Sequence, residues 1–286
     1  MKYLRHIASF IMAGVLSGCG GGSSNDPAQS ADAASRAYIL SSGTVYSFDG
    51  TTWATTSGSP PVSQMSSNYD YIGTVNHKTF MRRYDSDSGT YSTDQFDGTT
   101  WSVITPSNAP SDRSYGRQNY IGTLNKLIYQ YTYSGVDGSY IVYSFDGATW
   151  RQVSTTTAPV GNLNGSSYIG AINSKIYHYV YSGVDGSRTM YSFDGTTWVA
   201  LTAGKPDNTS NDPSASSYVG ILNGKAYHWL VDTTTGLPAT YEFNGSTWVK
   251  LSANTPSTLN MFTPSYLGEI GKKAYHWIKE SDGTRT

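Results

Sequence analysis

The chain has 286 residues, of which 14% are charged and 14% aromatic, and its formal net charge is -1. Repeated small units can share this length as one domain with a sizeable core. Because the charged residues are few and scattered, the sequence offers no electrostatic footprint for nucleic acid or for an anionic membrane surface. The 24 tyrosines, 7 tryptophans and 30 glycines are typical of many short strands joined by turns.

The N-terminus has the pattern of a secretion signal. Two basic residues precede an apolar stretch at 7–16, which is too short to span a bilayer. The motif Leu-Ser-Gly-Cys at 16–19 resembles the lipobox of bacterial lipoproteins. This resemblance implies that residues 1–18 are removed and that Cys19 is diacylated and becomes the mature N-terminus. Cys19 is the only cysteine, so no intramolecular disulfide can form.

A polar segment follows the cysteine. Residues 19–36 are rich in Gly, Ser, Ala, Asn and Asp, a composition that predicts a flexible tether. Gly20 stands where the inner-membrane retention signal of enteric bacteria has an aspartate, so the outer membrane is favoured. The sequence leaves open whether the protein faces the periplasm or the medium. We expect the chain to touch the membrane only through its N-terminal lipid.

From residue 37 onward the sequence repeats itself. One series, Phe-Asp-Gly-Thr-Thr-Trp and close variants, has tryptophans spaced by 48, 49, 48 and 50 residues. These are Trp53, Trp101, Trp150, Trp198 and Trp248. A second series, Tyr-Ile-Gly and close variants, alternates with the first. Its tyrosines are Tyr71, Tyr120, Tyr168, Tyr218 and Tyr266.

Each repeat unit predicts four antiparallel strands. In the third complete unit we expect strands at 168–172, 176–181, 189–193 and 197–201. Asn173-Ser174 suits a two-residue hairpin turn with positive φ, and Asp194-Gly195 suits the turn before the last strand. Four such strands make one blade of a β-propeller.

The repeats resemble the kelch family, in which each unit ends in an aromatic-Asp-turn-Trp pattern. The resemblance covers residues 37–286, although the Gly-Gly doublet usual in that family is missing. It implies an all-β propeller, and the five copies of each motif predict five blades. Residues 37–57 would supply the outer strands of a blade whose inner strands come from 266–280, which closes the ring without an exposed edge. Both 37–40 and 273–277 look like the second strand of that blade, and the sequence does not decide between them.

One repeat position carries three histidines, His178, His228 and His276. They belong to separate blades, so they should lie about 10 Å apart or more, too far to share a zinc ion with ligands near ~2 Å. We therefore expect hydrogen bonds between blades and no metal site. Asp70 and Glu269 break the repeat, but they are offset by about 13 Å along the channel, more than a glycosidase pair allows.

The remaining candidates form a polar rim where the chain enters the innermost strands. The candidate ligand-binding residues are Tyr69, Asp70, Tyr115, Arg117, Gln118, Asn119, Asn164, Ser167, Ser217, Phe262 and Ser265. Aromatic faces beside amide, carboxyl and hydroxyl groups suit sugars or extended peptides.

The sequence is compatible with three functions. The first hypothesis is a monomeric, non-enzymatic binding or scaffold lipoprotein without a cofactor, which presents one propeller face to an envelope protein or peptide. The alternative is a carbohydrate-binding propeller, since five blades of this length look like those of tachylectin-type sugar-binding proteins. An enzyme acting on sugars is the third, and it would need a carboxylate pair that the sequence does not place.

Overall fold

The structure is a computed structural model, and it describes the chain over fourteen ranges. These are 16–17, 37–41, 44–48, 52–55, 69–85, 90–110, 120–133, 140–155, 159, 162–181, 187–209, 218–251, 265–270 and 273–277. Every regular element in them is a strand. Accordingly, this part of the chain contains no helix that is long and apolar enough to cross a membrane.

Four antiparallel four-stranded sheets form consecutive blades, which we number one to four. Blade one is β5 (Tyr69–Val75), β6 (Lys78–Asp85), β7 (Thr90–Phe96) and β8 (Trp101–Ile104). Blade two is β9 (Tyr120–Leu124), β10 (Leu127–Tyr133), β11 (Tyr140–Phe145) and β12 (Trp150–Val153). Blade three is β13 (Asn162–Ile172), β14 (Lys175–Tyr181), β15 (Arg188–Phe193) and β16 (Trp198–Ala200). Blade four is β17 (Tyr218–Leu222), β18 (Lys225–Val231), β19 (Pro238–Phe243) and β20 (Trp248–Lys250).

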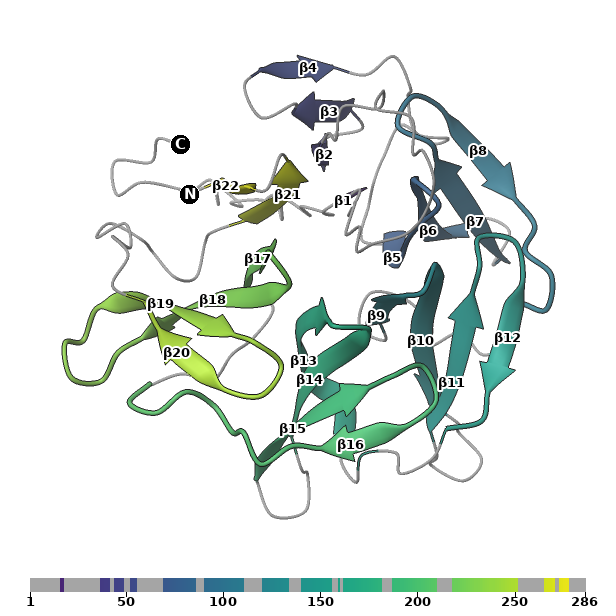
Figure 1. The fold of residues 1–286 in the computed structure, drawn as a ribbon. Coiled ribbons are helices and arrows are strands. Elements are labelled where there is room, and N and C mark those ends of the chain that lie inside the picture. The colour runs from purple at the N-terminus through teal and green to yellow at the C-terminus, as the bar shows by residue number, and fades with distance from the viewer. Residues whose placement is uncertain are drawn as a thin grey trace, which may run out of the picture.

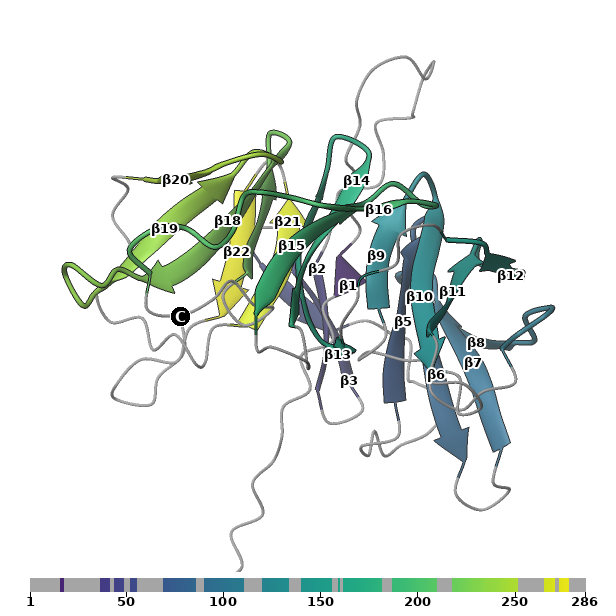
Figure 2. The same ribbon diagram turned by 90° about the horizontal axis from the view of Figure 1, so that it is seen from below.

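The blades stand around a common axis, with the first strand of each innermost (Figure 1). In the view turned by 90°, the innermost strands β5 and β9 run nearly along that axis (Figure 2). The predicted all-β class and the four-stranded blade are therefore confirmed, and the arrangement is that of a propeller.

The terminal segments form two further sheets. The N-terminal sheet has the order β1 (Leu16–Ser17), β2 (Ala37–Ser41), β3 (Thr44–Phe48) and β4 (Trp53–Thr55). The C-terminal sheet has only β21 (Ser265–Ile270) and β22 (Lys273–Trp277). The predicted pairing of the N-terminal outer strands with the C-terminal inner strands is thus not formed. The physical reason is that β2 already occupies the edge of β3 that β22 would need.

Two kinds of turn shape every blade. Asn173 and Ser174 have φ of 50° and 56°, which matches the predicted two-residue hairpin between β13 and β14. Before the last strand, the Asp194 carboxylate accepts hydrogen bonds from the backbone N–H groups of Thr196 and Thr197 at 2.9 and 2.8 Å. The Asp-Gly-Thr-Thr motif therefore recurs because its side chain closes a turn that leads into the tryptophan strand.

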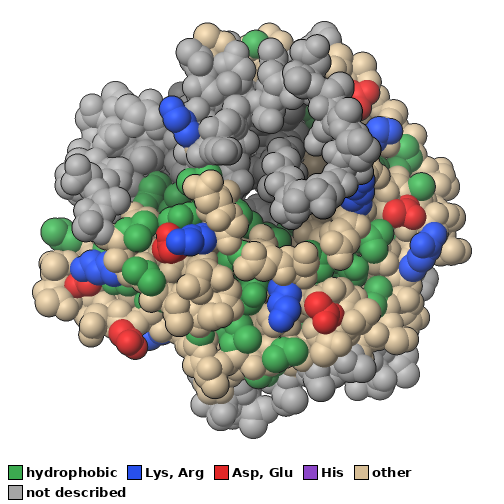
Figure 3. All heavy atoms as spheres, viewed as in Figure 1, with side chains coloured by type: hydrophobic (Ala, Val, Ile, Leu, Met, Phe, Trp, Pro, Cys, Tyr) green, Lys and Arg blue, Asp and Glu red, His purple; other side chains and the backbone are tan. Residues whose placement is uncertain are grey.

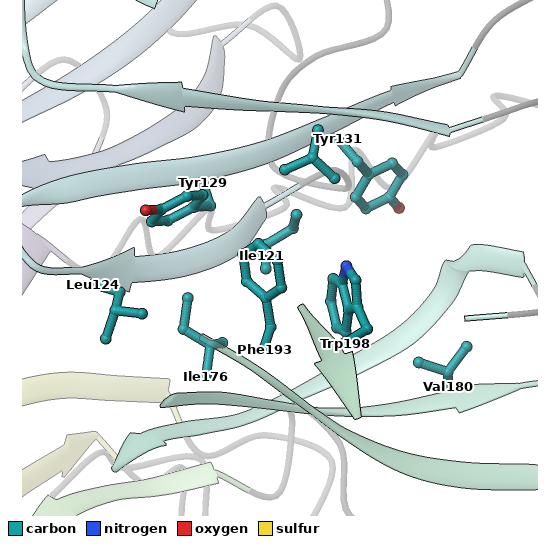
Figure 4. Close-up of a cluster of buried hydrophobic side chains, with 9 residues drawn as sticks. Ile121, Leu124, Tyr129, Tyr131, Ile176, Val180, Phe193 and Trp198 are labelled. Atoms are coloured by element: carbon teal, nitrogen blue, oxygen red, sulfur yellow. The ribbon is translucent and has the colours of Figure 1, made fainter. Parts of the chain in front are cut away.

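The hydrophobic core lies between blades. The cluster drawn in Figure 4 joins Ile121 and Tyr129 of blade two to Ile176, Phe193 and Trp198 of blade three. Two equivalent clusters join blades one and two, and blades three and four. At each interface between the four blades, the Phe before the Asp-Gly or Asn-Gly turn meets an aromatic ring of the preceding blade edge to face. The pairs are Phe80–Phe145, Tyr129–Phe193 and Tyr177–Phe243, with centroids 5.1, 5.3 and 5.1 Å apart.

A glycine on the innermost strand lets neighbouring blades approach closely. Gly122 has φ of 155° and lies at a bulge between β9 and β10. A Cβ atom there would lie 2.8 Å from Cδ1 of Ile176 in the next blade. The Tyr-Ile-Gly motif is therefore a packing motif, in which Ile fills the interface and Gly leaves room for it.

Candidate functional site

Three tyrosines lie side by side around the axis, one from the innermost strand of each of blades two, three and four. The ring of Tyr168 has its centroid 6.1 Å from that of Tyr120 and 5.7 Å from that of Tyr218. All three side chains are half-buried, so part of each ring remains accessible. We call Tyr120, Tyr168 and Tyr218 the tyrosine girdle.

The repeat motif explains this position. Tyr168 opens the Tyr-Ile-Gly motif on β13 and is paired with His178 on β14. Ile169 is fully buried between blades, whereas the tyrosine before it is not. Side chains alternate between the two faces of a strand, so Tyr168 lies on the face opposite to Ile169. Equivalent tyrosines at 71 and 266 belong to β5 and β21, but their side chains lie outside the described part of the structure.

Buried polar side chains support the girdle from behind. The rings of Tyr168 and His178 meet edge to face at 5.8 Å, and those of Tyr218 and His228 at 5.5 Å. Each histidine Nε2 is hydrogen-bonded to a backbone carbonyl oxygen of the preceding blade, at 2.5 Å for His178 and Ile121. The predicted hydrogen bonding between blades is therefore confirmed for both histidines.

Burial also sets the charge of these histidines. Desolvation lowers the pKa of His178 and of His228 to about 4, although the hydrogen bond to the neighbouring carbonyl works in the opposite direction. Both rings are therefore neutral at pH 7, when Nε2 carries a proton and donates it to the carbonyl oxygen. Their role is to fix adjacent blades, and with them the spacing of the tyrosine rings.

Charged residues break the repeat in blade one. Asp94 stands where blades two to four have tyrosine, and its side chain is 0% exposed. Its Oδ2 accepts a hydrogen bond from Nε of Arg83 at 2.9 Å, while its Oδ1 has no hydrogen-bond partner. The neighbouring Arg82 places its guanidinium 3.5 Å from the ring centroid of Tyr91.

A second polar cluster breaks the repeat in blade four. Glu242 stands where blades two and three have serine. Its carboxylate accepts hydrogen bonds from Nζ of Lys225 at 2.6 Å and from the hydroxyl of Tyr227 at 3.0 Å. The hydrogen bond from Lys225 lowers the pKa of Glu242, and burial together with Glu242 raises the pKa of Tyr227 to about 12.

Both polar clusters face the part of the ring between blade four and blade one, where the two terminal sheets lie. Asp94 is opposite Met81. The residues equivalent to Met81 in blades three and four are His178 and His228, which are hydrogen-bonded to the preceding blade. Glu242 is opposite Tyr227, whose equivalent Tyr177 contacts the following blade. Because equivalent residues of the repeat face the same way in every blade, Asp94 and Glu242 both face the place that a fifth blade would fill. Neither cluster was predicted from the sequence, although both carboxylates break the repeat on the third strand of their blades.

The candidate rim predicted from the sequence is only partly visible. The backbones of Tyr69, Asp70, Asn164, Ser167 and Ser265 lie on the innermost strands β5, β13 and β21, and nothing is described of their side chains. The other six candidates lie outside the described residues. These are Tyr115, Arg117, Gln118, Asn119, Ser217 and Phe262, and Cys19 also lies outside them.

One face of the molecule can be compared for its charge. In the face seen in Figure 3, Lys, Arg, Asp and Glu side chains are dispersed over the described part of the molecule. Within the same residues, no group of three or more His, Cys, Asp or Glu side chains could hold a metal ion.

No protein-family model and no curated protein matches the chain. Among solved structures, a family 117 glycoside hydrolase produced by the marine bacterium Zobellia galactanivorans is similar with a TM-score of 0.36 and 10% identity. That match covers 74% of this chain and 77% of the hydrolase. A β-1,2-mannobiose phosphorylase from Listeria innocua, in complex with β-1,2-mannobiose, is similar with a TM-score of 0.34 and 9% identity. It covers 87% of this chain and 86% of the phosphorylase.

These comparisons correct one expectation. Both solved structures are sugar-active enzymes, which overturns the prediction that this chain is not an enzyme. That prediction rested on missing linear motifs, and a site assembled from several blades has no linear motif to find. The hypothesis of a scaffold for protein or peptide partners gains no support from either structure.

Proposed function

We propose that this protein is a carbohydrate-binding propeller of the bacterial envelope, in which a glycan binds at the tyrosine girdle. The observation that carries the proposal is the row of three half-buried tyrosine rings with centroids about 6 Å apart. Sugar rings stack on aromatic faces, and tyrosine adds a hydroxyl that can donate or accept a hydrogen bond.

The surroundings of the girdle favour a neutral, hydroxyl-rich ligand. The hydroxyl of Tyr120 lies 3.1 Å from Oγ1 of Thr123, which in turn donates to the carbonyl oxygen of Thr74 in blade one. Among the residues that the structure describes, the histidines in contact with the girdle, His178 and His228, are neutral at pH 7. Aromatic stacking together with hydroxyl hydrogen bonds suits a hydroxyl-rich glycan.

Anchoring and ring closure belong to the same proposal. The lipobox-like motif at 16–19 supports lipidation of Cys19, removal of residues 1–18 and attachment to the outer membrane through a tether at 19–36. Five tryptophan motifs and five tyrosine motifs support a ring of five blades, in which the N-terminal and C-terminal half-units together make the fifth. The rim residues predicted from the sequence would then border the girdle at one end of the channel.

The test uses the full-length protein, purified from membranes in detergent and applied to a glycan array. Tyr168→Ala should abolish binding of any glycan that the parent chain retains, because the central ring of the girdle is lost. The matched control is Tyr181→Ala, which removes an exposed tyrosine from the far end of the same hairpin. Each retained glycan is also incubated with the protein and analysed for cleavage, so that turnover is detected as well as binding.

Two results would count against the proposal. A parent chain that retains no glycan would remove its basis. Equal loss of binding in Tyr168→Ala and Tyr181→Ala would place the site away from the axis.

A further inference from the structure

Two segments of this chain are copies of the same blade strand. β22 has the sequence Lys-Ala-Tyr-His-Trp, identical to residues 225–229 of β18, the second strand of blade four. β2 begins with Ala-Tyr, preceded by Arg36, and so matches the start of the same pattern. One blade has room for only one second strand.

The pairing register shows that both segments fit the same partner. In blade four, Tyr227 is opposite Glu242 and His228 is opposite Tyr241. In the N-terminal sheet, Tyr38 is opposite Ser47 and Ile39 is opposite Tyr46. Alignment of β22 with β18 places Tyr275 opposite Ser47 and His276 opposite Tyr46. β2 therefore pairs with β3 in the register that β22 would adopt.

The two segments differ in the inner strand that each brings. β22 is paired with β21, a six-residue strand that has the same bulge as the innermost strands of the four blades. β2 is paired with β1, which has only two residues, Leu16 and Ser17. These two residues precede Cys19, within the segment whose removal we have proposed.

The competing segments are already neighbours. β21 contacts β2 and β1 on one side and β17 of blade four on the other. In Figure 1 the β21–β22 hairpin lies between blade four and the N-terminal sheet. Among the described strands, β22 has β21 as its only partner, so its other edge is available to pair with β3.

We propose that removal of residues 1–18 switches the partner of β3 from β2 to β22. With residues 1–18 present, β1 and β2 complete a four-stranded sheet with β3 and β4. After their removal, β2 has an open inner edge, and the β21–β22 hairpin displaces it. The exchange converts a three-stranded and a two-stranded sheet into one complete blade, which leaves fewer open edges. It also brings His276 to the repeat position at which His178 and His228 bond to the preceding blade.

The consequence is that the ring closes only after export. Closure would complete the girdle with Tyr266 and release residues 37–41 to lengthen the tether. This inference rests on the proposed lipidation of Cys19, so the experiment has to separate the two.

The experiment traps each pairing with engineered disulfides in the full-length chain. Directly opposed residues of antiparallel strands have Cβ atoms within the range that a disulfide spans. A disulfide between Ile39→Cys and Tyr46→Cys shows that β2 is paired with β3. A disulfide between Tyr46→Cys and His276→Cys shows that β22 is paired with β3. Both pairs are made in the parent chain and in Cys19→Ala, which lacks the lipidation residue and keeps residues 1–18. In the parent chain, lipidated Cys19 has no free thiol.

The expected result is a reciprocal change between the two chains. Oxidised Cys19→Ala should be crosslinked between 39 and 46, and the processed chain between 46 and 276, each detected as a gel shift reversed by reductant. Tyr38→Cys with Ser47→Cys and Ser47→Cys with Tyr275→Cys repeat the comparison on the opposite face, in case one pair disturbs folding. A processed chain that still crosslinks 39 to 46 overturns the inference, as does a 46–276 crosslink formed only between two chains. Mass spectrometry of the N-terminus reports separately whether Cys19 is lipidated.

Discussion

Nε2 of His228 lies 3.0 Å from the backbone carbonyl oxygen of Ile169, although 59 residues separate them in the chain. His178 makes the equivalent bond to Ile121, and in blade two Gln130 donates from Nε2 to the carbonyl oxygen of Ile72 at 2.7 Å. One repeat position therefore links blades two, three and four each to the preceding blade, and it does so with two different side chains. The shared requirement is an N–H donor of the right reach in a buried site.

Glutamine should replace histidine at this position with little loss. We expect His228→Gln to change the free energy of unfolding by less than about 1 kcal/mol, because Gln130 already fills the role in blade two. His228→Leu should cost about 2 kcal/mol or more, since it leaves the buried carbonyl of Ile169 without a donor. Urea unfolding followed by tryptophan fluorescence measures both values, and equal losses in the two variants would contradict the assignment.

The buried histidines also predict loss of stability in mild acid. Their pKa of about 4 in the folded state lies below the ordinary value of 6.5 in the unfolded state, so the unfolded chain binds more protons between these values. Stability should be complete above pH 6.5 and fall as the pH drops toward 4, by on the order of 3 kcal/mol per histidine.

Thermal melts from pH 7.5 to pH 4 measure this decline, and His178→Gln combined with His228→Gln should flatten it. Carboxylates with lowered pKa, such as Glu242, lose their contribution only as the pH falls below their ordinary range, so they act at the acid end of the same series. An unchanged slope in the double variant would show that other groups titrate.

Much of the fold could be predicted because the same pattern of strands and turns recurs in every repeat unit. The turn at Asn173-Ser174 and the strands around it follow from local chemistry, and the spacing of the tryptophans fixed the blade as the repeating unit. The histidine position could also be interpreted, because equivalent residues on different blades are too far apart to share a metal. Each of these inferences uses information that lies within one unit or in its repetition.

The rest depended on contacts that no single unit contains. Nothing in the sequence decides whether β2 or β22 pairs with β3, because both carry the pattern of the same strand. The tyrosine girdle could not be predicted either. Tyr168 has the sequence pattern of a packing residue, and only the structure shows that its ring lies beside those of Tyr120 and Tyr218. Asp94 and Glu242 were not predicted because they lie on the third strands β7 and β19, whereas the charges expected to break the repeat, Asp70 and Glu269, lie on innermost strands.

The glycine of the Tyr-Ile-Gly motif gives a steric prediction. Gly122→Ala should cost about 1–3 kcal/mol, because the added Cβ would lie 2.8 Å from Cδ1 of Ile176 in the next blade. Gly204→Ala is the matched control, since a Cβ there would meet no atom within 4 Å. Ile176→Ala should relieve part of the clash, so the double variant should lose less stability than the two single losses added together. Additive losses in urea unfolding would refute a direct contact.

The buried ion pair of blade one gives a prediction that separates stability from function. Asp94→Ala should cost about 3 kcal/mol, because it leaves Arg83 without the carboxylate that accepts its Nε hydrogen bond in a largely buried site. Replacing both residues with those of blade two, as Arg83→Thr with Asp94→Tyr, should restore the free energy of unfolding to within about 1 kcal/mol of the parent chain. The reason is that a buried pair whose Oδ1 has no partner gains little over neutral side chains of the repeat.

Urea unfolding of the single and double variants tests this, and a double variant as unstable as Asp94→Ala would show that the pair itself stabilises blade one. If the double variant is stable, the same protein is applied to the glycan array. Retained binding would leave the pair with no part in recognition, whereas loss of binding would extend the ligand site from the girdle to the face of blade one that would border the proposed fifth blade.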